Sequence, residues 1–425
     1  MHLHRFVLRL FLACAFVGSA CVLPAAELKL LVQTGYIPSL PVLVRVEVRG
    51  DDNRRTWDLW DAEAILSVDD PGVILSTNRV HLYNGLGSTQ VSFIGGTNFV
   101  LTATFGSLQA SRALENLTNA PGTSIGGVLP GPATVWSGVV RVTNDVTVQA
   151  GQTLTIESNT LVLITGVASG SSAADLLING AIFSQGTEAH PVTITCASSN
   201  LNWGQIRHNN AQASVYSYTS ITRAGRAAAE GHTGSGPAIR PSNSRITFQS
   251  CNITDLSVGS PRNTIGKIMF VTGGANAALI FDDCLLARAR MGPEITGSAV
   301  LFTNSAITEM FGSDDADGIY LQQQNAGQVI TLVDSVFARG EDDGIDTLGS
   351  TITIDHCIVR DWDNPNEDAK GVTVFSGETR ILNSLVVNCA IAVSTKSSGS
   401  GTAFTRIDRS TIRGIDRAIA AENKG

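Results

Sequence analysis

One pattern recurs through the second half of the chain: FQSCNIT (248–254), FDDCLLA (281–287), FTNSAIT (302–308), LVDSVFA (332–338), IDHCIVR (354–360), LNSLVVN (382–388) and IDRSTIR (407–413). In each string a polar residue leads to a small Ser or Cys, and an apolar stretch follows. YTSIT, which ends at Thr222, is an earlier instance. The small residues are Ser220, Cys251, Cys284, Ser305, Ser335, Cys357, Ser384 and Ser410, at spacings of 31, 33, 21, 30, 22, 27 and 26 residues.

A repeat of this length that carries short strands and no 3.6-residue periodicity indicates a solenoid built from β-strands. A parallel β-helix fits the variable spacing, because each coil keeps its strands in register and absorbs insertions in its turns. Equivalent residues of neighbouring coils stack about 4.8 Å apart, which explains why one position stays small. Cysteine at that position acts as a small apolar filler. We therefore expect residues 136–425 to form a parallel β-helix.

The preceding part of the chain predicts a different all-β domain. Residues 27–117 alternate apolar and polar in short runs, such as Val42, Val44, Val46 and Val48, and the runs end in Gly-, Asp- and Asn-rich turns. Roughly ninety residues with this spacing are typical of an immunoglobulin-like β-sandwich. Residues 118–135 (TNAPGTSIGGVLPGPATV) are rich in Gly, Pro and Thr and predict a linker.

Composition supports an all-β chain and excludes some functions. Charged residues make up 16% of the 425 residues, below the roughly 25% of an average soluble chain. The net charge of −8 and the absence of basic runs argue against a nucleic-acid partner. No stretch approaches the ~20 apolar residues of a transmembrane helix.

The N-terminus predicts export from the cytoplasm. Residues 1–26 are typical of a signal peptide, with Arg5 and Arg9 before a short apolar core and small residues that end at Ala26. Cleavage there would release a secreted protein. Alternatively, Gly18-Ser19-Ala20-Cys21 resembles a bacterial lipoprotein box, which would anchor the protein to the cell surface through a lipid on Cys21.

The seven cysteines predict packing. They lie at positions 14, 21, 196, 251, 284, 357 and 389, without a CxxC pair. This pattern matches neither a disulfide framework nor a zinc site. Three of these cysteines occupy the small position of the repeat.

A second repeated string accompanies the small residues. It reads Asp317-Gly318-Ile319, Asp343-Gly344-Ile345, Lys370-Gly371-Val372, Cys389-Ala390-Ile391 and Arg417-Ala418-Ile419. If these strings are in register, Asp317, Asp343 and Lys370 form one column. The surrounding residues make the densest acidic cluster of the chain: Asp314, Asp315, Glu341, Asp342, Asp346, Asp361, Asp363, Glu367 and Asp368.

The repulsion between the carboxylates of such a column can be relieved in three ways. Two carboxylates about 4.8 Å apart repel by about 3–4 kcal/mol at an effective dielectric constant near 20. Sharing a proton would separate their pKa values, as in glycoside hydrolysis. Binding a cation would make a Ca²⁺ site, for which Asp317, Asp342, Asp343 and Asp346 are the candidate ligands. Recruiting Lys370 would neutralise the column without any chemistry.

The coils resemble a known superfamily. Residues 138–166, 176–195 and Asn202-Trp203-Gly204-Gln205-Ile206 look like the opening coils of right-handed parallel β-helix proteins of the pectin-lyase-like superfamily. That superfamily contains lyases, hydrolases, epimerases and non-catalytic surface proteins, so the resemblance implies a fold without deciding the activity. The sandwich and coils together also resemble modules of large bacterial surface proteins. Since the chain ends part-way through a coil, we expect further domains in a longer parent protein.

Two motifs resemble those of polygalacturonases. Asp315-Ala316-Asp317-Gly318-Ile319 is similar to their N-T-D-G-I motif, and Glu341-Asp342-Asp343 is similar to their G-D-D motif. The resemblance implies that Asp317, Asp342 and Asp343 act as catalytic acid and base. The chain departs from the family at Ala369-Lys370-Gly371, which replaces G-H-G, and at Arg406-Ile407-Asp408, which replaces R-I-K.

These observations predict a secreted or cell-surface β-helix protein that binds polysaccharide or a cell-surface glycan. Arg339, Arg360 and Lys396 are the candidate substrate-binding cations. Whether the protein is also an enzyme stays open. A polygalacturonase-like hydrolase would use the three aspartates, and a Ca²⁺-dependent uronate lyase would use Lys370 or Arg339 as its base.

Overall fold

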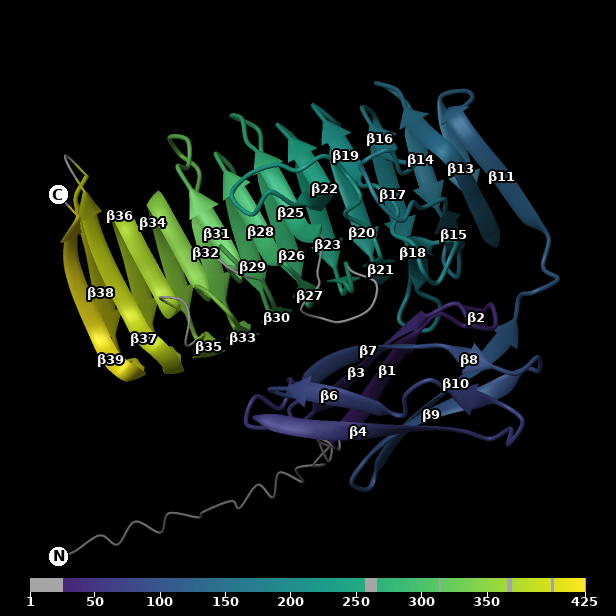
Figure 1. The fold of residues 1–425 in the computed structure, drawn as a ribbon, viewed down its shortest axis with the longest axis horizontal. Coiled ribbons are helices and arrows are strands. Elements are labelled where there is room, and N and C mark those ends of the chain that lie inside the picture. Colours follow the sequence, from purple (N-terminus) through teal and green to yellow (C-terminus); the bar gives the residue numbers. More distant parts are fainter. Residues whose placement is uncertain (1–25, 257–265, 313–314, 365–368, 399–400, 425) are drawn as a thin grey trace, which may run out of the picture.

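The computed structural model describes residues 26–256, 266–312, 315–364, 369–398 and 401–424 (Figure 1). The regular structure in these ranges is β-strand, and they contain no helix long and apolar enough to span a membrane. The predicted signal peptide and the lipid site at Cys21 fall on residues 1–25 and so lie outside the described residues.

The N-terminal domain is an antiparallel structure with its own core. Its seven main strands hydrogen-bond in the order β1-β3-β7-β6-β4-β9-β10, while β2 pairs with β10 and β5 pairs with β8. The bounds are β1 Glu27–Val32, β2 Gly35–Tyr36, β3 Val42–Arg49, β4 Asp61–Val68, β5 Ile74–Leu75, β6 Arg79–Tyr83, β7 Leu86–Val91, β8 Phe93–Ile94, β9 Phe99–Phe105 and β10 Leu108–Asn116. The alternating valines of β3 all enter this core, as their spacing predicts.

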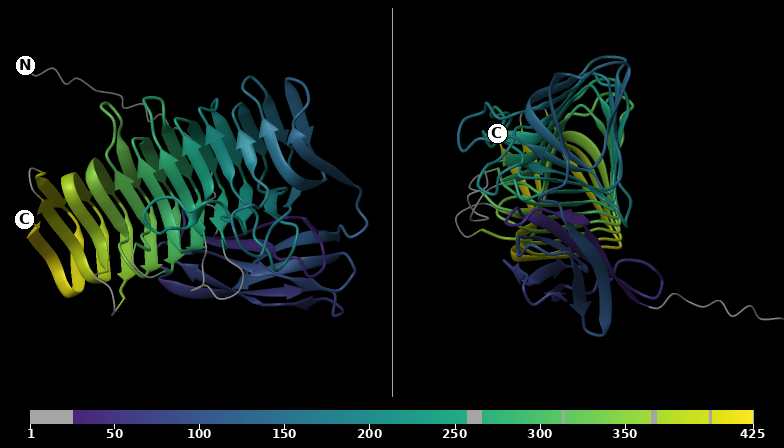
Figure 2. Two further views of the ribbon diagram at one scale, coloured as in Figure 1. Left: turned by 45° about the horizontal axis from the view of Figure 1, so that its top comes forward. Right: turned by 90° about the vertical axis from the view of Figure 1, so that its right-hand side faces the viewer.

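The rest of the described chain forms one parallel solenoid of 29 strands (Figures 1 and 2). Its first strands are β11 Gly122–Val128, β12 Ala133–Trp136, β13 Val139–Val148, β14 Thr153–Ile156, β15 Leu161–Ile164, β16 Leu176–Ile178, β17 Ala181–Gln185, β18 Val192–Cys196, β19 Ile206–Asn209, β20 Ser214–Ser217, β21 Thr219–Thr222, β22 Gly236–Ser242, β23 Arg245–Gln249 and β24 Asn252–Thr254.

The later strands are β25 Gly266–Thr272, β26 Ala278–Asp282, β27 Leu285–Ala289, β28 Met291–Thr296, β29 Ala299–Thr303, β30 Ala306–Met310, β31 Ile319–Gln322, β32 Ile330–Val333, β33 Val336–Gly340, β34 Ile345–Asp355, β35 Ile358–Trp362, β36 Lys370–Leu382, β37 Leu385–Ser398, β38 Ala403–Asp408 and β39 Thr411–Lys424. From β13 to β31 each strand pairs with the third strand after it, so a coil contains three strands. Because β34 and β36 continue through a corner, later strands pair with the second strand after them.

The predicted linker is wrong. Residues 118–135 contain β11 and most of β12, and these strands pair in parallel with β13 and β14. The solenoid therefore begins before residue 136. Glycine and proline suggested a flexible segment, but parallel pairing uses backbone groups and requires no apolar pattern from an edge strand.

The ladder of small residues is confirmed for seven of its eight members. The register places Cys251, Cys284, Ser305, Ser335, Cys357, Ser384 and Ser410 at equivalent positions of successive coils. Ser220 is the exception, because it pairs with Asn252 and leaves Thr219 at the ladder position. Cys196, Cys251, Cys284, Cys357 and Cys389 are all buried and unpaired, so the packing prediction for the described cysteines is confirmed.

The ladder also carries hydrogen bonds between coils. The Cys284 amide donates to Ser305 Oγ at 2.8 Å, and the Ser305 amide donates to Ser335 Oγ at 3.2 Å. Ser335 Oγ in turn donates to the Val333 carbonyl oxygen at 2.7 Å. A serine here therefore satisfies one buried amide and one carbonyl group at a tight corner.

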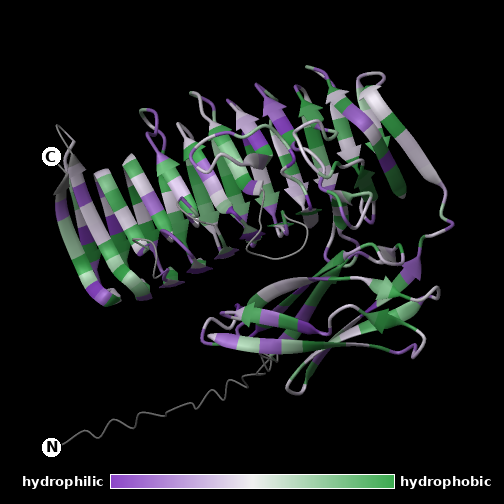
Figure 3. Cartoon of the chain, in the orientation of Figure 1, coloured by the Kyte–Doolittle hydropathy of each residue, from purple (hydrophilic) through white to green (hydrophobic). Residues whose placement is uncertain are grey.

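The corner explains the polar residue that precedes each small one. Asp283, Asn304, Asp334 and Asn383 have φ between 46° and 54°, in the left-handed region. Asn and Asp adopt this conformation more readily than other non-glycine residues because their short side chains bond the local backbone. Hydrophobic and polar residues alternate along the strands (Figure 3). Inside the coils, Phe248, Phe281, Phe302 and Phe337 form a row with neighbouring ring centroids 5.1–5.6 Å apart.

The antiparallel domain lies along one side of the solenoid (Figure 2). Leu86 and Trp57 pack on small apolar residues of β27, β30, β33 and β35, which form a separate apolar cluster. Polar contacts border this cluster: Arg45 donates to Asp283 at 2.8 Å, and Arg360 donates to Asn84 Oδ1 at 2.8 Å. Equivalent strands of successive coils form a stack, here called a strand set. The domain thus covers the strand set that contains β27, and these contacts leave the strand set that contains β31 and β34 uncovered.

We predict that Ser335→Ala lowers the free energy of unfolding by about 1–3 kcal/mol, because it leaves the buried Ser305 amide without an acceptor. Chemical denaturation followed by circular dichroism measures this loss. The control is Ser124→Ala on β11, where the serine is exposed, and it should change stability by less than about 0.5 kcal/mol. Equal stability of the two variants would contradict the ladder's role.

Candidate functional site

Asp317, Asp343 and Lys370 form the predicted column. The Gly318 amide donates to the Asp343 carbonyl oxygen, and the Gly344 amide donates to that of Lys370, each at 2.8 Å. These bonds place the three residues at equivalent positions in successive coils. Cys389 does not continue the column, because Ile391 pairs with Lys370 in the next coil.

Close approach of the coils explains the glycine that follows each of these residues. A Cβ atom on Gly318 would lie 2.4 Å from the Gly344 carbonyl oxygen, and one on Gly344 would lie 2.6 Å from that of Gly371. Both distances are shorter than non-bonded contacts allow. In the Asp-Gly-Ile string, the close approach of the coils therefore requires the glycine, and the aspartate before it lies next to the equivalent residue of the neighbouring coil.

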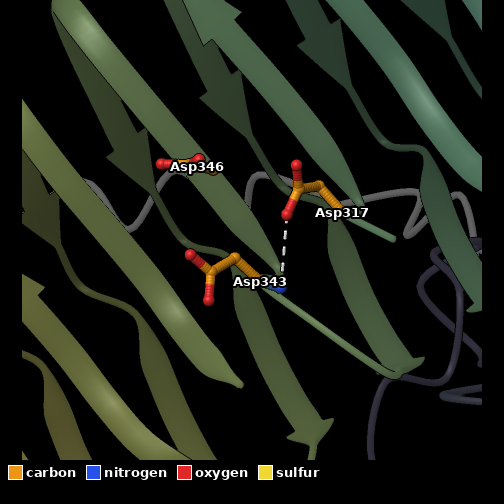
Figure 4. A group of neighbouring side chains, drawn as sticks. All are labelled: Asp317, Asp343 and Asp346. Atoms are coloured by element: carbon orange, nitrogen blue, oxygen red, sulfur yellow. Dashed lines mark hydrogen bonds between the residues drawn. The ribbon is translucent and has the colours of Figure 1, made fainter. Parts of the chain in front are cut away.

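Asp346, on β34, completes an acidic trio with Asp317 and Asp343 (Figure 4). One carboxylate oxygen from each residue lies within 4.8 Å of the others. Asp317 is 3% exposed and Asp343 is 5% exposed. Asp343 Oδ1 and Asp346 Oδ1 are buried without a hydrogen-bond partner, and the Lys370 ammonium lies 3.5 Å from Asp343 Oδ1.

The trio borders a pocket of about 360 Å³. The lining residues are Asp315, Tyr320, Asp342, Asp343, Asp346, Leu348, Lys370, Thr373, Phe375 and Lys396. Asp342 lies in this pocket outside the trio, and its Oδ2 accepts a hydrogen bond from the Asp315 amide at 2.9 Å. The trio and pocket together hold five aspartates against two lysines, which leaves an excess of negative charge.

The electrostatics of the trio favour protons or a cation. Burial raises the pKa of Asp317 well above its usual range, and the Asp346 and Asp342 carboxylates raise it further. Burial and the Asp343 carboxylate raise the pKa of Asp346 well above the usual value, and they raise that of Asp342 to about 7. Burial also raises the pKa of Asp343, although the Lys370 ammonium opposes this shift.

The geometry of the trio fits a calcium ion. Two oxygens that bind one Ca²⁺ at 2.3–2.6 Å can be no more than about 4.6–5.2 Å apart, and the trio meets this limit. Carboxylates of inverting glycosidases are about 6.5–9.5 Å apart so that a water fits between them. The carboxylate oxygens of the trio lie closer together than this. Buried carboxylate oxygens without donors are also the ligands that Ca²⁺ prefers.

The structure brings together most of the predicted site residues. Asp342, Asp343, Lys370 and Lys396 line the pocket, and Asp317 and Asp346 belong to the trio. Asp314, Glu367 and Asp368 lie outside the described residues. Tyr320 and Phe375 were not predicted, because their place follows from the register that pairs Tyr320 with Asp346 and Leu348 with Phe375.

Arg339 and Arg360 lie elsewhere, which corrects their prediction as substrate-binding residues. Arg339 donates to the Tyr83 hydroxyl at 2.8 Å, and Arg360 is fully buried against Asn84 and the Trp60 carbonyl group. Both contact the antiparallel domain. Their position in the repeat placed them near the acidic column in sequence, but they belong to the strand set that the domain covers.

The chain matches no protein-family model, no curated protein and no solved structure with which it was compared. Only the site itself therefore indicates the function.

The raised pKa values predict a pH-dependent stability without added cation. Between about pH 4 and pH 7 the folded protein retains protons on these aspartates that the unfolded chain has released, so the free energy of unfolding falls as the pH rises. We expect a fall of about 1–4 kcal/mol. Asp342→Asn should flatten the dependence, whereas exposed Asp416→Asn should not. Thermal unfolding in the presence of a chelator from pH 4.5 to 7.5 measures this pH dependence of stability. Stability that rises with pH across this range would contradict the prediction.

Proposed function

We propose that this is a secreted or cell-surface protein that binds acidic polysaccharide through a Ca²⁺ ion held by Asp317, Asp343 and Asp346. One observation carries the proposal: the buried Asp317 and Asp343 and the half-buried Asp346, from two coils, converge within 4.8 Å beside an open pocket. Ca²⁺ would relieve their repulsion and keep free coordination positions toward the pocket. A sugar carboxylate is the anionic group that suits such a position.

The remaining pocket residues suit a sugar ligand. Lys370 and Lys396 supply cations for a second carboxylate, and the rings of Tyr320 and Phe375 supply apolar surface. Sites for small ligands commonly combine such apolar walls with a few charged groups that fix orientation. Neutral glycans would use the rings but would gain nothing from the cation, so we expect a preference for uronate-rich polymers.

We also propose the finer fold assignments. The strand order β1-β3-β7-β6-β4-β9-β10 supports an immunoglobulin-like sandwich, in which β1-β3-β7-β6 would be the A-B-E-D sheet and β4-β9-β10 the C-F-G sheet, with β6 and β4 hydrogen-bonded to each other where the two meet. The solenoid is proposed to be right-handed and pectin-lyase-like, because parallel crossover connections are right-handed in about 98% of cases and because its opening coils resemble that superfamily. This architecture supports a surface protein that presents an extended face.

A specific observation favours a second function, cleavage of the bound uronate by β-elimination. The Lys370 ammonium lies 3.5 Å from Asp343, so a base candidate stands beside the proposed cation. The cation would neutralise the sugar carboxylate, and the base would remove the adjacent proton. Inverting hydrolysis through Asp317, Asp342 and Asp343 is less favoured because Asp317 and Asp343 are too close together to hold a water between them.

Calorimetry of the chelator-treated protein tests the proposal. We expect Ca²⁺ to bind, and polygalacturonate to bind only when Ca²⁺ is present, while dextran does not bind. Asp343→Asn should weaken Ca²⁺ binding by more than about 100-fold, since even outer-shell partners contribute about 10–100-fold. The exposed Asp58→Asn variant is the matched control.

The same samples separate binding from catalysis. New reducing ends together with ultraviolet absorbance from unsaturated sugars, both lost with a chelator, would show a lyase. Reducing ends without that absorbance would show a hydrolase. Unchanged polymer would leave a binding protein, and no Ca²⁺ binding by the unmodified protein would contradict the proposal.

A further inference from the structure

A loop between β21 and β22 folds over the strand set that carries the site. Glu230 and Ser235 form a β-bridge across this loop. Arg240 Nε on β22 donates to both carboxylate oxygens of Glu230, at 2.7 and 2.9 Å. These contacts hold the intervening residues, which include His232, in a defined position.

His232 is fixed by a buried ion pair. Its Nδ1 lies 3.0 Å from Glu294 Oε1, and its amide donates to Glu294 Oε2 at 3.2 Å. Glu294 also accepts a hydrogen bond from Lys267 at 2.5 Å, and both of these side chains are at most 2% exposed. Because Nδ1 is engaged by the Glu294 carboxylate, Nε2 is the ring nitrogen left to contact a ligand.

The imidazole itself is accessible and lies next to the pocket. The His232 side chain is 42% exposed. Its ring stands edge-on to that of Tyr320 at 4.7 Å between centroids, and Tyr320 lines the acidic pocket. The Glu294, Asp346 and Asp317 carboxylates all help to raise the pKa of Tyr320, after the larger effect of its burial. Tyr320 therefore contacts His232, which is bound to Glu294, and also lines the pocket beside the acidic trio.

The register gives the separation of these groups. Glu294 pairs with Tyr320, and Tyr320 pairs with Asp346, so two coil steps separate Glu294 from Asp346. Two steps correspond to about 9–10 Å along the solenoid axis. An oligosaccharide lying along the axis spans the distance from Glu294 to Asp346.

We propose that His232 forms a second contact point for the glycan. Its Nε2 atom makes a hydrogen bond with a sugar hydroxyl, while a neighbouring uronate binds at the acidic trio. This inference rests on the proposed function and extends it to a ligand of more than one sugar unit. The buried Lys267–Glu294 pair then serves to orient the imidazole. A pair buried at this depth loses the solvation of both charges and is a poor source of stability by itself.

Two substitutions separate contact with the ligand from support of the loop. His232→Asn keeps an amide that can bond Glu294 in place of Nδ1 but has no atom at the Nε2 position. His232→Gln can place its amide group at the Nε2 position. Calorimetry with Ca²⁺, galacturonate and a galacturonate hexamer measures binding, and thermal unfolding checks the fold.

For the unmodified protein we expect the hexamer to bind more tightly than galacturonate. His232→Asn should weaken hexamer binding about 10-fold and leave galacturonate and Ca²⁺ binding unchanged, and His232→Gln should restore part of the loss. Unchanged hexamer binding by His232→Asn would overturn the inference alone, as would an equal loss for galacturonate, hexamer and Ca²⁺, which would show mere support of the loop. Absence of oligomer binding by the unmodified protein would overturn the proposed function and this inference together.

Discussion

The structure depends on one recurring contact, in which a small side chain sits at a left-handed corner and bonds the backbone of the neighbouring coil. The amides of Cys284, Ser305 and Ser384 each donate to the serine hydroxyl one coil further on. A larger side chain would separate the coils, and a side chain without an acceptor would leave a buried amide unsatisfied. Coil spacing and register both follow from this contact.

The regular stacking of the coils brings the acidic residues of the site together, and the proximity of their charges is electrostatically unfavourable. Once the coils stack, Asp317 and Asp343 must lie one above the other, and Asp346 on β34 joins them. Burial raises the pKa values of all three, and repulsion from neighbouring carboxylates raises those of Asp317 and Asp346 further. A fold stabilised by close stacking therefore holds carboxylates where a proton or a cation is needed, and such clustering is typical of functional sites.

The corners have a second role, because the antiparallel domain docks on them. Arg45 and Arg55 bind Asp283 at one corner of the coil, and Tyr83 contacts Glu309 and Arg339 at the next corner. The domain consequently covers the strand set of β27. The acidic pocket belongs to the set of β31 and β34, so domain docking and ligand binding use different strand sets.

The sequence by itself determined the parallel solenoid, the ladder from Cys251 to Ser410 and the Asp317–Asp343–Lys370 column, because each depends on a position that recurs within one repeat. It could not assign Tyr320 to the pocket, Arg360 to the domain contact or β11 to the solenoid. It also placed Ser220 one residue out of register. Only the tertiary structure decided these points, because they depend on which strand set a residue joins and on what packs against that set, and neither is encoded in a local pattern of residue types.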